Sequence, residues 1–133
     1  MANNTITFNP DSNAEAYGVN LVVNTKTDFT STFKVVRPDK SNFDFTSYTA
    51  SSAMAKSASI GSSTGVAGNF TVGFTSAFDG EFKITMDKSI TEDLKPGRYV
   101  WDILVKAPVS SGSTVYRLAE GNVTVISGVS AAI

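Results

Sequence analysis

Apolar and polar residues alternate with a period of two along most of the chain, and this alternation restricts the fold more than any other feature. In residues 81–86, for example, Phe82, Ile84 and Met86 occupy every second position. Successive side chains of a β-strand point to opposite faces, so this period is typical of strands with one face toward a core. The pattern predicts strands at residues 5–8, 17–24, 29–36, 48–54, 69–75, 81–86, 99–106 and 114–126.

One short helix is predicted over residues 87–94, with Ser89 as its N-cap and Glu92 as the capping-box partner. Pro96 and Gly97 follow it and favour a tight turn. Many short strands with at most one helical turn indicate two packed antiparallel sheets. We therefore expect an all-β fold, an immunoglobulin-like antiparallel β-sandwich of about seven to nine strands.

Tyr99 makes this expectation more specific. It comes two residues after Gly97, where sandwich domains often hydrogen-bond a tyrosine hydroxyl to the backbone of a corner between strands. An ordinary Pro-Gly turn before a strand is the alternative, and it is equally compatible with an all-β fold.

The strand at residues 99–106, which contains Trp101, is largely apolar on both faces. We expect it to be central and covered on both sides. Asp102 interrupts it, and a buried carboxylate needs a partner. Arg117, across the predicted hairpin, is a better partner than Arg98, which lies four positions away on the same extended strand. We expect a structural ion pair rather than a catalytic acid.

Three segments leave alternatives open. Residues 48–54 are small enough to suit a helix, although their alternation favours a strand. Residues 57–68 are rich in Ser, Gly and Ala, which predicts a mobile loop. Gly121 stands where the alternation of the last strand shifts phase, which predicts a β-bulge there.

The composition argues against an enzyme. The chain has no Cys and no His, and so lacks thiolate nucleophiles, zinc–thiolate sites and the commonest general base. Its 12 acidic residues are scattered, and no calcium loop or phosphate-binding glycine motif is present. We expect no catalytic residue, no cofactor and no resident metal, although incidental ion binding in an acidic loop stays open.

The charge pattern also limits the partners. The 11 basic and 12 acidic residues give a formal charge of −1, with no basic cluster, so we expect neither nucleic acid nor membrane as a partner. We expect no transmembrane helix and no signal peptide, because no apolar run is long enough. The 17 Ser and 15 Thr residues predict a neutral surface suited to permanent packing against other subunits. A free soluble domain with an unusual surface is the alternative.

Most aromatic residues sit at alternating positions typical of a core, whereas Tyr17, Tyr48 and Phe78 lie nearest to turns and are better contact candidates. We expect residues 17–126 to form the sandwich. Residues 1–16 are an N-terminal arm or edge strand, and residues 127–133 are a C-terminal tail. The terminal candidates for contacts with a neighbouring subunit are Ile6, Phe8, Val129 and Ile133, with frayed termini as the alternative.

Five segments together resemble a known group of proteins. They are residues 29–35 (FTSTFKV), 43–46 (FDFT), 79–84 (DGEFKI), 96–103 (PGRYVWDI) and 116–125 (YRLAEGNVTV). The chain resembles the small virion structural proteins of marine tailed bacteriophages, and more distantly the N-terminal sandwich of phage baseplate upper proteins. The resemblance covers about residues 28 to 126, and the last segment is its most specific part.

This resemblance implies a non-enzymatic virion protein, made in the host cytoplasm, that decorates or joins parts of the particle. Its partners would be other virion proteins, with a homo-oligomer expected. The sequence departs from the baseplate proteins in ending at residue 133 without a long C-terminal shaft or receptor-binding region, and we therefore expect no host-receptor binding. The alternatives are a glycan-binding or host-surface adhesion module, which predicts a row of exposed aromatic rings, and a small hydrolase, which the missing His and Cys disfavour.

Overall fold

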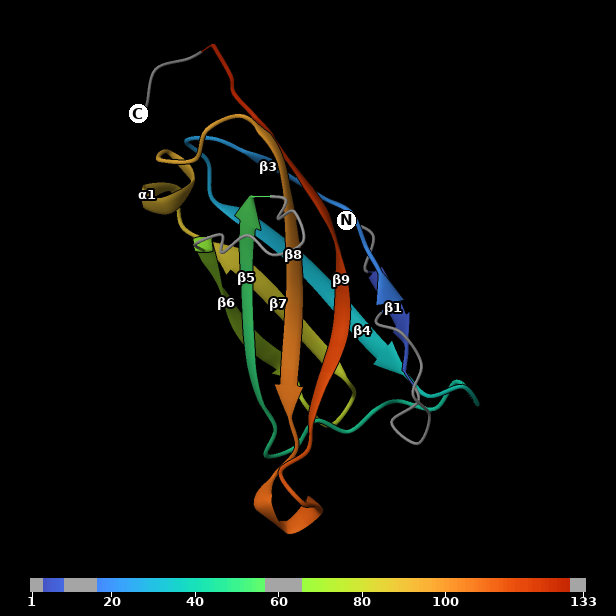
Figure 1. Ribbon diagram of the computed structural model, residues 1–133. Helices are drawn as coiled ribbons and strands as arrows, with labels where there is room; N and C mark the ends of the chain where they lie inside the picture. Colours follow the sequence, from blue (N-terminus) through green and yellow to red (C-terminus); the bar gives the residue numbers. More distant parts are fainter. Residues whose placement is uncertain (1–3, 9–16, 57–65, 130–133) are drawn as a thin grey trace.

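The computed structural model describes residues 4–8, 17–56 and 66–129 of the 133-residue chain (Figure 1). The all-β prediction is confirmed: these residues form nine strands and one short α-helix, with one 3₁₀ turn. In chain order, the elements are β1 (Asn4–Thr7), β2 (Tyr17–Gly18), β3 (Leu21–Asn24), β4 (Phe29–Val36), β5 (Thr49–Lys56), β6 (Val66–Ser76), β7 (Glu81–Met86), α1 (Lys88–Thr91), β8 (Gly97–Lys106), η1 (Val109–Ser111) and β9 (Val115–Ile126).

The strands form one mixed sheet in the order β1-β4-β7-β6-β5-β8-β9-β2, with β3 also paired to β9. The pairs β1–β4, β2–β9 and β3–β9 are parallel, and the other pairs are antiparallel. The prediction of a purely antiparallel arrangement is therefore wrong. Side chains alternate in the same way in both kinds of pair, so the sequence pattern holds no information about the direction of a neighbouring strand.

Strand β6 connects the two halves of the sheet. Its first part, including Phe70, pairs with β5, and its second part, including Val72, pairs with β7. The sheet is thus continuous and nearly closes into a barrel, instead of dividing into the two separate layers expected (Figure 1). On the side of β1, the ring of Phe8 contacts the ring of Tyr116 in β9, with centroids 5.3 Å apart. Because β6 has 11 residues, it is long enough to serve both halves.

The inward-facing side chains meet in a single core rich in aromatic rings. The rings of Phe33 and Phe82 stack with their centroids 5.1 Å apart. The ring centroids of Phe33 and Trp101 are 6.0 Å apart. Ile84 and Ile103 are completely buried. Burying each large apolar side chain stabilises the fold by about 1.5–3 kcal/mol, so this core holds the strands together without a disulfide bond.

The short helix α1 begins differently from the prediction. Its N-cap is Asp87, whose carboxylate accepts the backbone N–H of Ser89 at 3.0 Å, so Ser89 lies inside the first turn. The carboxylate of Asp28 accepts the N–H of Lys88 at 2.8 Å. Two carboxylates thus satisfy backbone donors that have no partner within the helix, which explains why Ser89 is not the cap.

The bulge in β9 also lies elsewhere than predicted. Ile103 pairs with Ala119, whereas Leu104 pairs with Arg117, so Leu118 is the extra residue. Leu118 and Ala119 are consecutive and both buried, which is possible because the bulge turns both side chains inward. The prediction of a bulge at Gly121 is therefore wrong.

Candidate functional site: the outer face of β5, β8 and β9

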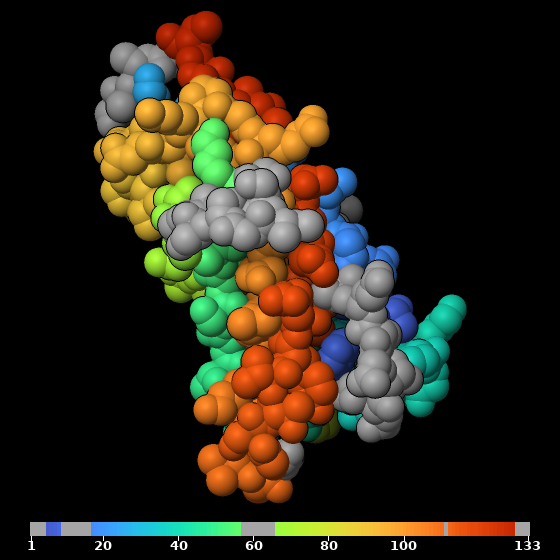
Figure 2. Space-filling view, in the orientation of Figure 1, coloured from blue at the N-terminus to red at the C-terminus, as the bar shows by residue number. Residues whose placement is uncertain are grey.

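Strands β5, β8 and β9 carry a surface that we call the outer face (Figure 2). Along β8, the inward side chains from Tyr99 to Val105 are buried, whereas the alternating residues between them are accessible. The outer face consists of Thr49, Ser51, Ala53 and Ala55 of β5; Arg98, Val100, Asp102, Leu104 and Lys106 of β8; and Val115, Arg117, Glu120, Asn122 and Thr124 of β9.

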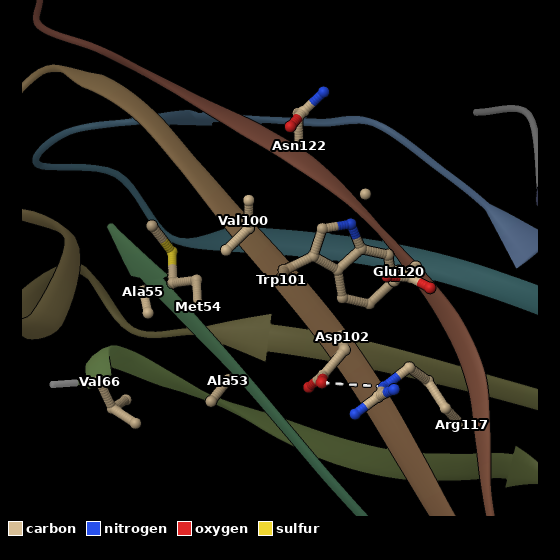
Figure 3. Close-up of a pocket in the computed structure, with 11 residues that line it drawn as sticks. Ala53, Met54, Ala55, Val66, Val100, Trp101, Asp102, Arg117, Glu120 and Asn122 are labelled. Atoms are coloured by element: carbon tan, nitrogen blue, oxygen red, sulfur yellow. Dashed lines mark hydrogen bonds and ion pairs between the residues drawn. The ribbon is translucent and has the colours of Figure 1, made fainter. Parts of the chain in front are cut away.

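The described residues of this face line two depressions. The larger has a volume of about 570 Å³, and Ala53, Ala55 and Gly121 are among the small residues that line it (Figure 3). The smaller, of about 220 Å³, lies beside Leu104 and Val115. Val115 is 54% exposed. The face therefore combines hollows between small residues with accessible aliphatic side chains.

A single described ion pair lies on the outer face. The Arg117 Nε atom is 3.3 Å from the Asp102 Oδ2 atom (Figure 3). The expected partner of Asp102 is thus the one in the structure, but the two side chains are 39% (Asp102) and 53% (Arg117) exposed. An exposed pair of this kind contributes roughly 0–1 kcal/mol to stability.

The expectation that β8 is covered on both sides is contradicted, since the outer side chains of this strand remain accessible among the described residues. Val100, Leu104 and Glu120 were therefore missed as surface residues. A signal for them exists in the sequence. Arg98 and Lys106 share one row with Asp102, and charges at alternate positions of a strand are typical of a solvent-facing row.

Beneath the outer face, Trp101 joins β8 to the segment between β2 and β3. Its indole N–H donates to the carbonyl of Val19 at 2.8 Å. A Cβ atom on Gly121 would lie 1.9 Å from that same carbonyl oxygen, so glycine is needed for close approach of the two backbones. The side-chain oxygen of Asn20 accepts the N–H of Asn122 at 3.2 Å, which keeps this donor satisfied.

The corner before β8 has the geometry expected from the sequence. The hydroxyl of Tyr99 donates to the carbonyl of Lys95 at 2.6 Å, and the Tyr99 side chain is buried. The Lys56 Nζ atom lies 4.7 Å from the centre of the Tyr99 ring, a cation–π contact. Tyr99 and Trp101 therefore have structural roles.

Two proposed interface residues belong to the chain's own core. Ile6 in β1 is completely buried, and Phe8 is half-buried against Phe43 and Tyr116. The candidacy of Ile6 for contacts between subunits is therefore corrected, whereas that of Phe8 stays a prediction. Strand β1 pairs with β4, so its alternation reflects burial inside the same chain.

The remaining interface candidates lie in different parts of the fold. Tyr48 is half-buried against Phe45. Tyr17 in β2 is 43% exposed, and Phe78 in the turn between β6 and β7 is 73% exposed. Val129 is fully exposed, and Ile133 lies outside the described residues. Tyr17 and Phe78 are on elements that are not neighbours in the sheet, so residues 4–8, 17–56 and 66–129 contain no row of exposed rings.

Three exposed carboxyl groups have a lowered pKa because of local hydrogen bonds. The Ser41 hydroxyl and N–H lower the pKa of Asp39, and the Thr46 hydroxyl and N–H lower the pKa of Asp44. Ser89 acts in the same way on the pKa of Asp87. Burial raises the pKa of the Tyr48 phenol. These groups stabilise turns and the helix start and do not converge on a cleft.

The described residues contain no group of three or more acidic side chains placed to hold a metal ion. Within the same residues, no helix has the length and apolarity needed to cross a membrane. No protein-family model matches the sequence, and a search of curated proteins returns no match.

Proposed function

We propose that the chain is a non-enzymatic structural subunit of a tailed-bacteriophage particle, which decorates the capsid or joins parts of the neck, tail or baseplate by protein–protein packing. The observation that carries the proposal is the outer face of β5, β8 and β9. It presents Val100, Leu104 and Val115 around shallow hollows and places charged residues between them.

This composition suits a binding surface between proteins. Interfaces combine apolar contacts with polar groups at their rim, and they need no catalytic constellation. Apolar side chains are also exposed elsewhere, at Val22 of β3 and Ile126 of β9, which is compatible with such a role. The phage assignment itself rests on the sequence segments described above, of which residues 116–125 belong to β9 and contribute to the outer face.

We also infer that the barrel is a variant of the immunoglobulin-like sandwich. The Tyr99–Lys95 hydrogen bond and the buried Trp101 support this inference, because both features recur in sandwich domains. Closure of the two layers through β6 is the main departure.

Mass spectrometry of purified particles tests the role. We expect the chain in washed, gradient-purified particles at a fixed ratio to the major capsid protein, and a phage protein known to stay in the lysate serves as the contamination control. A copy number in the hundreds indicates capsid decoration, whereas about six or about twelve copies indicate the neck, tail or baseplate. Presence in the lysate with absence from particles would contradict the proposal.

A further inference from the structure

The outer face carries an unbalanced group of charges. Asp102 in β8 and Glu120 in β9 are directly opposite each other in the strand register. Like charges in this relation destabilise a sheet. Arg117 pairs with Asp102, which leaves Glu120 without a counter-charge among the described residues (Figure 3). A guanidinium that lies between an Asp102 of its own chain and a Glu120 of a neighbouring chain would give every carboxylate of the group a cationic neighbour.

We propose that this cation is Arg117 of a second copy of the same chain, and that two copies pack outer face to outer face around a two-fold axis. The axis crosses β9 between Arg117 and Glu120, so each Arg117 faces the Glu120 of the other copy. This inference deepens the proposed function by naming a partner and its docking face, and rests on the proposed role as a building subunit.

The charges of Arg117 and Glu120 favour this position of the axis over two alternatives. The two-fold axis lies between the two packed faces and runs across the strands. A residue on one side of the axis therefore meets, in the second copy, the residue at the same distance along the strand on the other side of the axis. An axis through Arg117 would bring two guanidinium groups together, and an axis through Glu120 would bring two carboxylates together. With the axis between Arg117 and Glu120, each of these residues faces a residue of opposite charge in the second copy. Asp102 then faces Leu104 of the second copy.

The shape of the face agrees with this axis. Arg117 and Leu104 form one level of the sheet, and Glu120 and Asp102 form the next. The next outward residue beyond Arg117 is the exposed Val115, and the next beyond Glu120 is Asn122, one of the residues that line the larger depression. The two-fold axis therefore places Val115 of each copy against Asn122 of the other, at the margin of that depression.

The available area predicts a weak dimer. The three strands of the outer face, about 4.8 Å apart, and the ten residues of β8 give a face of roughly 480 Å². Two such faces bury about 950 Å², in the range of weak and transient contacts. We expect a dissociation constant of roughly 1–100 µM.

Charge reversal tests the axis in sedimentation equilibrium of the full chain over roughly 1–300 µM. Arg117→Glu and Glu120→Arg should each weaken self-association by about tenfold or more, because like charges then face each other. An equimolar mixture of these two variants should associate, because each copy then supplies what the other lacks. The double variant R117E/E120R should self-associate again, since Asp102 keeps a cationic neighbour at position 120.

Val22→Lys, on β3 outside the face, is the control and should leave the dissociation constant unchanged. Circular dichroism verifies that each variant is folded. A wild-type chain that stays monomeric over the whole range overturns the proposal, as does a mixture of the two reversals that fails to associate.

A cross-link provides a second readout that does not depend on charge. The chain has no cysteine, so Val115→Cys and Asn122→Cys introduce the only thiols. On one extended strand these positions are roughly 20 Å apart, too far for an internal link by a spacer of about 10 Å. Because packed sheets lie about 10 Å apart, a bis-maleimide reagent with a spacer of about 10 Å should join the V115C/N122C variant into a covalent dimer much faster than V115C alone. Equal rates would count against the proposed packing.

The experiments distinguish a failure of the proposed function from a failure of the proposed docking face. A monomeric chain that is present in particles would leave the structural role intact and remove the docking face. A dimer with the expected response to charge reversal, absent from particles, would leave the docking face intact and remove the phage assignment.

Discussion

The two faces of β8 differ far more in the folded chain than in the sequence. The inward row contains Trp101 and Ile103, which are almost completely buried, whereas Leu104 belongs to an open row with Asp102. Both rows contain large apolar residues, so hydrophobicity alone does not distinguish them. The contrast teaches that apolar residues on both faces of a strand do not require two covered layers, because one of the two faces can remain open.

The largest expected effect comes from comparing two neighbouring aliphatic residues, one on each face of β8. Ile103→Ala should lower the free energy of unfolding by about 2–5 kcal/mol, because it leaves a cavity in the core. Leu104→Ala should lower it by less than about 1 kcal/mol, because the side chain remains in contact with solvent. Urea unfolding at low protein concentration, where the chain is monomeric, measures both. Equal losses would show that the outer face is covered.

Gly121 in β9 provides a second test, because its substitution would affect the packing beneath the outer face. Gly121→Ala should cost about 1–3 kcal/mol, since its Cβ atom would overlap the Val19 carbonyl and force the backbones apart. Gly18→Ala, at a site with no atom within 4 Å of the new Cβ, should stay within about 0.5 kcal/mol of wild type. Fluorescence of the single Trp should change in the first variant only, because Trp101 donates to that carbonyl. A tolerated Gly121→Ala would disprove the close approach.

The corner tyrosine gives a smaller effect. Tyr99→Phe removes the hydrogen bond to the Lys95 carbonyl and should cost about 1 kcal/mol, with the ring still buried. Tyr17→Phe, at a more exposed position, is the matched control and should change stability very little. Thermal unfolding followed by circular dichroism compares them. If both variants unfold at the wild-type temperature, the corner does not stabilise the fold.

The smallest effect concerns acid pH and the turns at the ends of the strands. Hydrogen bonds from Ser41 and Thr46 lower the folded-state pKa values of Asp39 and Asp44 below the unfolded value of about 3.9. Their contribution is therefore present above that pH and is lost as the pH falls through the folded-state values. The D39N/D44N variant should lose stability less steeply than wild type between about pH 5 and pH 2. Parallel slopes of the urea midpoint against pH would refute this assignment.

Much of the fold was predictable because the local alternation of apolar and polar residues indicates which side chains are buried. The strand at residues 29–36 has the predicted limits, and residues 49–56 form a strand despite their small side chains. The pairing of Asp102 with Arg117 was also predictable, because the two residues lie close together across the predicted hairpin, although the expected burial of Asp102 was wrong. The helix cap at Asp87 and the bulge at Leu118 were not, because each depends on a register set by distant segments.

The sequence by itself determined that this chain is all-β and which side chains of a strand share a face, because a period of two assigns alternate residues to opposite faces. Only the tertiary structure decided that three pairs are parallel, that Ile6 fills the chain's own core, and that the outer row of β8 is open. Those outcomes depend on which strands become neighbours and on what covers each face. Neither is contained in the alternation of one strand, since the same row of residues suits a second layer, solvent or another copy of the chain.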